Sequence, residues 1–153
     1  MAQIAPVRSY QARPMGDVIT GLPLAAWWKR FLAGVADFFI LGIGNVLLSF
    51  IHLTSASRAL FTLLMGLCYY GALAGSRRGQ TVGMEFLGIA VRRSYDGAPL
   101  GFWRAAWRQF VACLMAALVL PFVLDCLAPL WDKRRRAWHD HLSSAIVVDI
   151  IER

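Results

Sequence analysis

A carboxylate inside a long apolar run constrains this chain more than any other feature. Asp37 lies between Phe31 and Leu53 in a segment with no other acidic or basic side chain except His52. A helix needs about 20 apolar residues to cross a bilayer, so this run is long enough to span one. A carboxylate there costs roughly 2.5–3.5 kcal/mol and needs a partner or a water-filled pocket. Arg30, seven positions earlier, shares its helix face but lies about 10 Å away along the axis, so we expect each to contact other parts of the protein.

The composition indicates an integral membrane protein. Hydrophobic residues make up 58% of the chain and charged residues 16%, whereas soluble domains average about 45–50% and 25%. The net charge of +7 is also typical of proteins that bind nucleic acid. Here the basic residues flank apolar segments instead of forming one stripe, as the positive-inside rule describes. We therefore expect a lipid bilayer as a partner, and no nucleic acid.

The apolar pattern predicts three membrane regions. Helices are expected at about residues 27–53, 58–75 and 102–131. The third region contains Pro121, so it is expected to cross once or to be re-entrant or broken near that residue. The small-xxx-small spacing from Gly71 to Gly75 would permit close approach of a second helix.

A small cap is expected outside the membrane. Residues 81–87 suit a short interfacial helix, residues 87–93 suit a strand, and Asp96-Gly97 is a hairpin turn signal. The β-branched tail, residues 144–151, could pair with this hairpin. The predicted fold class is thus an all-α membrane protein with three apolar regions and a small cytoplasmic β-hairpin or strand cap.

Basic segments set the expected topology. Residues 1–24 are predicted to be a largely extended cytoplasmic tail, 25–149 the membrane domain and 150–153 a C-terminal tail. Positive-inside bias also places the connector 76–101 in the cytoplasm. A third region that crosses once would export the basic run Lys133–Arg136, whereas one that turns back would retain it. We favour the second arrangement, with a cytoplasmic C-terminus.

Three blocks of sequence resemble a known family. Lys29–Asp37 opens the first helix with Arg and Asp seven apart, Gly79–Val91 follows the second helix, and Ala137–Val148 closes the chain. In this order the blocks resemble the RDD family of small bacterial membrane proteins, which is named for one arginine and two aspartates. The resemblance covers roughly residues 24 to 149.

The resemblance maps the family's charged residues onto Arg30, Asp37 and Asp140. The chain departs from the family pattern at Ser143–Ala145 and at Met84-Glu85, where relatives carry a threonine and a basic residue respectively. The resemblance implies a bacterial membrane protein. Together with the positive-inside bias, which places the N-terminus in the cytoplasm, we expect a multi-pass protein of the inner membrane. Transport is the activity that has been suggested for the family.

The Arg30, Asp37 and Asp140 set has two interpretations. Membrane carboxylates can bind a cation or carry a proton, which would make the set a transport site. The same residues could form a buried charge network that holds helices together. In that case we expect Asp37 to meet Arg104 or Arg108 from the third region, and Asp140 to meet Arg30.

Other polar residues predict structural roles. Asp125, also flanked by apolar residues, suits snorkelling or capping. The pair His139 and His141 brackets Asp140, but residues two apart do not share a helix face, so a turn or a helix cap at Asp140 is favoured over a metal site. The segment Gly79–Gly83 lacks the lysine and hydroxyl ending of a P-loop, and no nucleophile motif or cysteine framework is present. We expect no enzyme activity, no metal and no cofactor.

Two functions remain open from the sequence. The chain is either a transport component that handles a cation or proton, or a non-catalytic accessory or assembly subunit of a larger membrane complex. So few helices cannot enclose a path alone, so we expect a homo-oligomer or a larger membrane-protein complex.

Overall fold

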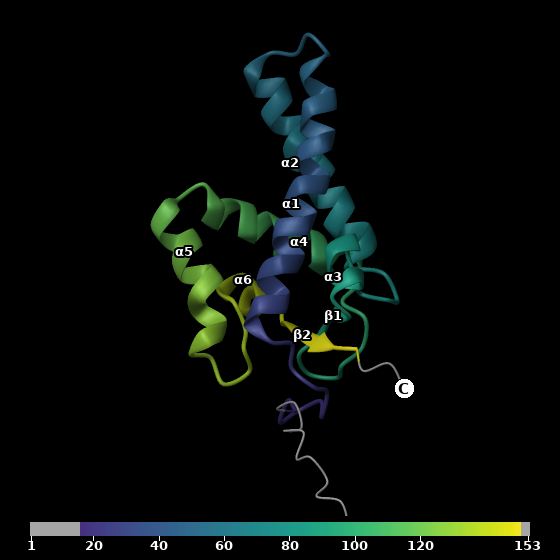
Figure 1. Cartoon of the computed structure of the whole chain (residues 1–153), viewed down its shortest axis with the longest axis vertical. Helices are drawn as coiled ribbons and strands as arrows, with labels where there is room; N and C mark the ends of the chain where they lie inside the picture. The colour runs from purple at the N-terminus through teal and green to yellow at the C-terminus, as the bar shows by residue number, and fades with distance from the viewer. Residues whose placement is uncertain (1–15, 151–153) are drawn as a thin grey trace, which may run out of the picture.

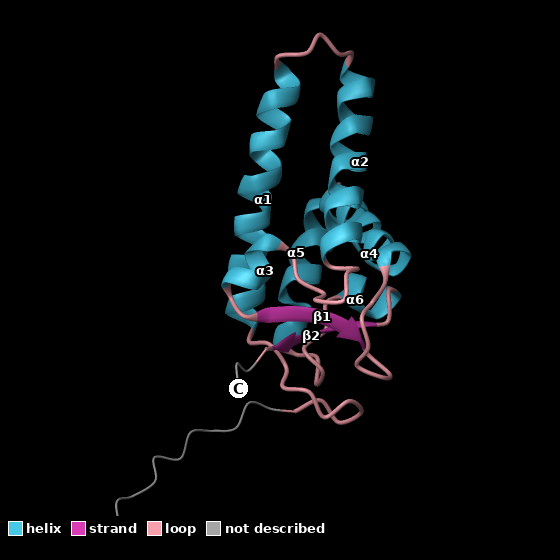
Figure 2. Ribbon diagram, turned by 90° about the vertical axis from the view of Figure 1, so that its right-hand side faces the viewer, coloured by secondary structure: helices cyan, strands magenta, loops and turns pink. Residues whose placement is uncertain are grey.

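A two-helix hairpin stands on a small mixed cap in the computed structural model, which describes residues 16–150 (Figure 1). In chain order the elements are α1 (Trp27–Ser49), α2 (Ser55–Leu73), α3 (Val82–Phe86), β1 (Ile89–Arg93), α4 (Phe102–Ala116), α5 (Val119–Leu127), the 3-10 helix η1 (Ala128–Leu130), α6 (Trp138–Leu142) and β2 (Ala145–Asp149). Figure 2 shows α1 and α2 rising side by side from the end of the molecule that holds both strands.

The hairpin helices confirm the first two predicted membrane helices. Within the described residues, α1 and α2 are the two helices long and apolar enough to cross a membrane. Thr54 caps α2, because its side chain accepts a hydrogen bond from the Ser57 backbone N–H at 3.2 Å. Nearer the cap than Thr54, the Thr62 hydroxyl of α2 donates to the Asn45 side chain of α1. Large apolar side chains such as Phe38 and Ile43 remain exposed, as expected for surfaces that face lipid or other helices.

The third apolar region is broken into short helices. The chain leaves helical geometry at Leu118, where φ is −121° and ψ is 116°. Pro121 follows within the first turn of α5, a position that tolerates its missing N–H. With 15 residues in α4 and 9 in α5, these helices extend only about 22 and 14 Å. Figure 1 shows α5 returning toward the cap. The broken alternative is therefore the one observed, and a third membrane crossing is not confirmed.

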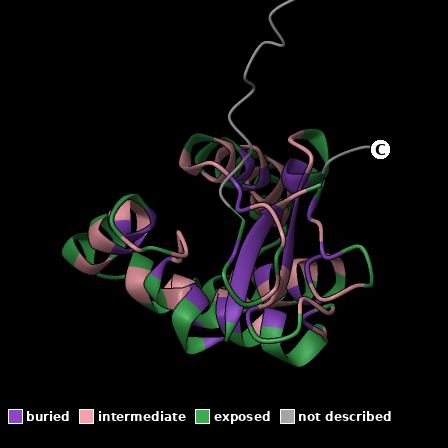
Figure 3. Cartoon of the chain, turned by 90° about the horizontal axis from the view of Figure 1, so that it is seen from below, coloured by how far each residue is buried: buried purple, intermediate pink, exposed green. Residues whose placement is uncertain are grey.

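Both predicted strands form and pair with one another. β1 and β2 are antiparallel, with Val91 opposite Val147. Leu24, just before α1, adds a bridge to Val148. Most residues of the two strands are buried, and Figure 3 colours them purple. Since β1 follows α2 and β2 follows α6, the segments before α1, after α2 and after α6 all meet at one end of the hairpin.

The hairpin expected at Asp96-Gly97 is reduced to a tight turn. Gly97 has a positive φ of 70°, and its N–H donates to the Arg93 carbonyl at 3.0 Å. Beyond the turn, Pro99 forms a single bridge with Arg92. Proline cannot donate to a ladder, so the long partner of β1 is β2 and not the second arm of a local hairpin.

Close packing explains the small residues near the end of α2. A Cβ on Gly71 would lie 2.8 Å from Phe102 Cε2, and one on Gly75 would lie 2.7 Å from Phe102 Cα. Both distances are too short for real contacts, so the two glycines admit the start of α4 against α2. The predicted close approach is confirmed, and α4 is the helix that uses it.

The N-terminal tail is only partly within the described residues. Residues 1–15 of the predicted extended tail lie outside them. Asp17 is buried, accepts hydrogen bonds from Thr20, and pairs with Arg134 Nε at 2.6 Å. The hydrogen bonds from Arg134 and Thr20 hold the pKa of Asp17 well below its ordinary value despite its desolvation. Asp17 and Leu24 therefore fasten this segment to the cap, through Arg134 and through the bridge to Val148.

Candidate functional site

Asp140 joins three helices through one buried carboxylate. It is fully buried in the first turn of α6. Arg30 of α1 pairs with Oδ2, and Arg108 Nε of α4 donates to Oδ1 at 2.7 Å. The backbone N–H of Ala137 also donates to Oδ2, at 3.1 Å, so Asp140 caps its own helix from within. The expected contact between Arg30 and Asp140 is present, and Arg108 adds a second cation.

These cations keep Asp140 ionised. Burial alone would raise the pKa of Asp140, but the charges of Arg30, Arg108 and His139 lower it further than burial raises it. The net result is a carboxyl pKa well below its ordinary value. Arg30 also donates to the Arg135 carbonyl, which fixes the guanidinium over the loop before α6. The cluster is therefore a charged clamp between α1, α4 and the cap.

Asp37 belongs to a separate cluster. It is fully buried and accepts three hydrogen bonds: Tyr69 Oη at 2.8 Å and Gly83 N at 2.9 Å on Oδ1, and Thr81 Oγ1 at 2.6 Å on Oδ2. Thr81 is also the N-cap of α3, because its hydroxyl oxygen accepts from Met84 N at 3.3 Å. Asp37 thus attaches the spanning helix α1 to α2 and to the first turn of α3.

The expected pairing of Asp37 with an arginine was wrong. Arg108 is taken by Asp140, as described above. Arg104 lies on the cap surface, where its Nη1 donates to Tyr95 Oη at 2.5 Å. Within residues 16–150, no cation forms a salt bridge with Asp37. Hydrogen-bond donors satisfy this carboxylate instead of an opposite charge.

Gly83 makes this arrangement possible. A Cβ at that position would lie 2.4 Å from the Ala33 carbonyl oxygen and 3.0 Å from Asp37 Oδ1. Only glycine lets the first turn of α3 press so closely on α1. Sequence reasoning missed Tyr69, Thr81 and Gly83 as partners. The sequence did offer one signal for these partners. Thr81 suits the N-cap of a short helix, and Gly83 follows it by two residues, in the block after the second membrane helix.

Asp125 acts as a cap, one of the two roles expected for it. Its Oδ1 accepts from the backbone N–H of His139 at 3.0 Å, and its Oδ2 lies 2.5 Å from His139 Nδ1. The other ring nitrogen, Nε2, lies 3.4 Å from Asp140 Oδ1, so His139 bridges two carboxylates. His141 instead lies near Asp132, at 3.5 Å. In the described part of the chain, no group of three or more potential ligands could hold a metal.

A cleft lies beside both clusters, between α1, α4 and α5. Its volume is about 440 Å³. Apolar side chains form most of its walls. Its polar lining residues include members of both clusters, namely Arg30, Asp37, Tyr70, Arg108, Asp125 and His139. The site therefore combines an apolar cavity with these polar lining residues, which we call the floor of the cleft. Their charges are largely paired within the protein.

Comparison with known proteins identifies the family but no individual relative. No curated protein and no solved structure matches the chain. A sequence model described as the RDD family matches residues 24–144, which includes Arg30, Asp37, Asp140 and the whole hairpin. The match covers well over half of the 153 residues, and it agrees with the two membrane-length helices. This protein belongs to the RDD family.

Proposed function

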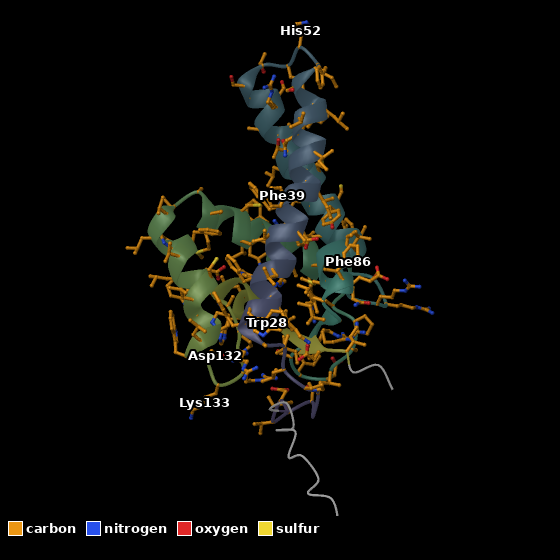
Figure 4. All side chains as sticks on the ribbon, in the orientation of Figure 1. Trp28, Phe39, His52, Phe86, Asp132 and Lys133 are labelled. Atoms are coloured by element: carbon orange, nitrogen blue, oxygen red, sulfur yellow. The ribbon has the colours of Figure 1, made fainter. Side chains whose placement is uncertain are left out.

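We propose that this RDD-family protein crosses the bacterial inner membrane through α1 and α2, with both termini and the cap in the cytoplasm. Figure 4 places His52 at the far tip of the hairpin and Lys133 at the opposite end. Residues 50–57 at the tip contain no Lys or Arg, whereas the cap holds Arg77, Arg78 and the run Lys133–Arg136. Positive-inside bias then supports a cytoplasmic cap.

Thiol labelling in intact cells tests this orientation. The background would first lose its three native cysteines, Cys68, Cys113 and Cys126. His52→Cys should then react with a membrane-impermeant maleimide added outside the inner membrane. Lys133→Cys should react only after permeabilisation. The opposite pattern would reverse the orientation.

We further propose that the protein is a non-catalytic subunit that assembles with other membrane helices. The observation that supports this proposal is that protein donors already occupy both oxygens of Asp37 and both oxygens of Asp140. A cation site needs carboxylate oxygens that remain free to coordinate the ion. Exposed side chains such as Phe38 and Phe39 offer α1 a large surface for neighbouring helices.

Transport of a cation or proton is the second candidate. One observation favours it: Asp37, although bonded, lines the cleft. In a homo-oligomer, clefts of several copies could meet and form a path. Asp37→Asn distinguishes the two functions, because the amide preserves the shape of the side chain but removes its charge.

Native mass and ion flux test these alternatives together. The complex extracted in mild detergent from its own membrane should contain other proteins if the chain is an accessory subunit. Vesicles that hold the purified protein should then show no more cation or proton flux than empty vesicles. A homo-oligomer whose flux is lost in a folded Asp37→Asn variant would instead establish transport and overturn the subunit proposal.

A further inference from the structure

The cleft between α1, α4 and α5 has the form of a ligand site. Its volume of about 440 Å³ lies within the roughly 300–1,000 Å³ of typical small-molecule pockets. Apolar side chains from three elements line its walls, including Val35 and Leu41 of α1, Ala112 and Ala116 of α4, and Phe122 of α5. Such walls suit a hydrocarbon chain.

Arg108 supplies unused donors at the floor of this cleft. It is only 7% exposed, and its Nε is bonded to Asp140. A guanidinium carries five N–H groups, and among the described residues its Nη1 and Nη2 make no hydrogen bond. Arg108 lines the cleft together with Tyr70. Among the described residues, the buried side-chain atoms that lack a partner do not include Nη1 or Nη2 of Arg108, so these donors are accessible and not sealed in the interior. A ligand that brings an acceptor oxygen to the cleft can bond to them.

The charges at the floor favour an uncharged acceptor. The cleft is lined by two arginines, Arg30 and Arg108, and by two carboxylates, those of Asp37 and Asp125. Asp140 lies outside the lining and pairs with both arginines. An anionic head would meet unfavourable fields from Asp37 and Asp125, and a cation would meet Arg108. A carbonyl or ester oxygen accepts hydrogen bonds without adding charge.

The corner between α4 and α5 indicates where the ligand comes from. Leu118, Val119 and Leu120 are highly exposed, with Val119 at 80%. Three consecutive exposed apolar residues beside the cleft suit immersion in lipid. A ligand can therefore enter sideways from the bilayer without passing through water.

We propose that the cleft binds one bilayer amphiphile, with a neutral carbonyl or ester head at Arg108 and an acyl chain between α1 and α5. This inference rests on the membrane location of the protein and not on its role as a subunit. It assigns Arg108 a second task beside its ion pair with Asp140.

Photolabelling of the full-length protein in vesicles tests this site. The probe is an acyl methyl ester that carries a diazirine on its chain, and labelled peptides are mapped by mass spectrometry. We expect label to concentrate on the walls of the cleft. Ala112→Phe adds a bulky side chain to the lining of the cleft and should reduce that label at least fivefold. Leu114→Phe, on the exposed face of the same helix, is the matched control and should not.

A second probe tests the polar head. A hydrocarbon of the same length with the same diazirine lacks the acceptor oxygens, and we expect it to label the cleft at least fivefold less. Equal labelling by both probes would overturn the assignment of Arg108. Label spread evenly over α1 and α2 and unchanged by Ala112→Phe would overturn the site itself. Neither failure would alter the native mass or the flux result, so this inference and the proposed function fail separately.

Discussion

Replacement of Asp140 by asparagine should strongly destabilise the protein. The side chain is fully buried and accepts from Arg30, Arg108 and the Ala137 backbone. The amide keeps one acceptor oxygen, so at least one guanidinium loses its partner at a position almost closed to water. Breaking a buried ion pair by removal of one member costs about 3–5 kcal/mol. We expect the free energy of unfolding of Asp140→Asn to fall by that amount.

The pH dependence of this loss gives the prediction a second signature. The pKa of Asp140 is depressed in the folded state, so its contribution to stability is present above the unfolded pKa of about 3.9. It declines as pH falls below that value toward the folded pKa. The difference between wild type and Asp140→Asn should therefore be constant above about pH 5 and should shrink below about pH 4.

Equilibrium unfolding in mixed detergent micelles, followed by tryptophan fluorescence, measures both effects. Glu85→Gln is the matched control, because it removes the same charge from an exposed pair with Arg78 at 3.5 Å. Surface pairs contribute about 0–1 kcal/mol, so this control should change stability little. If Asp140→Asn costs no more than the control at pH 7, the clamp between α1, α4 and α6 does not hold the fold together and the reasoning is refuted.

Two further substitutions test the cluster around Asp37. Gly83→Ala places a methyl group 2.4 Å from the Ala33 carbonyl oxygen, so overpacking should lower the free energy of unfolding by about 1–3 kcal/mol. Gly34→Ala is the control, because that glycine has open space around it. This control should leave stability unchanged or raise it slightly in the same unfolding assay. Thr81→Val keeps the volume of the side chain but removes both the cap of α3 and a hydrogen bond to Asp37, and a loss of about 1–2 kcal/mol is expected. A Thr81→Val protein as stable as wild type would show that α3 does not depend on that hydroxyl.

The membrane helices and the strands could be predicted from the sequence because local pattern determines them. Runs of apolar residues long enough to span a bilayer define α1 and α2. The β-branched run Ile146–Val148 marks β2, and the turn signal Asp96-Gly97 follows β1. The pairing of the two strands was considered as one option, because it requires only that both lie on the same side of the membrane. Local pattern could not decide how residues 102–131 fold, because the chain leaves helical geometry at Leu118, three residues before the proline that marks a break in the sequence.

The partners of the buried carboxylates were harder to predict. Charge complementarity suggested that Asp37 would meet an arginine, and it correctly joined Arg30 to Asp140. The fold directs the Nε of Arg108 to Asp140. Asp37 is satisfied by a backbone N–H and two hydroxyls. Such neutral donors are common in any sequence, so nothing in the local pattern distinguishes the ones that the fold brings together.

Hydrogen exchange of the cap amides tests most directly whether these carboxylates fasten the cap to the hairpin. The Gly83 amide is bonded to Asp37 and the Ala137 amide to Asp140. Asp37→Asn should speed exchange across α3 and leave α6 protected, whereas Asp140→Asn should speed exchange across α6, and α2 should stay protected in both. Unchanged protection of α3 and α6 in folded variants would contradict the account.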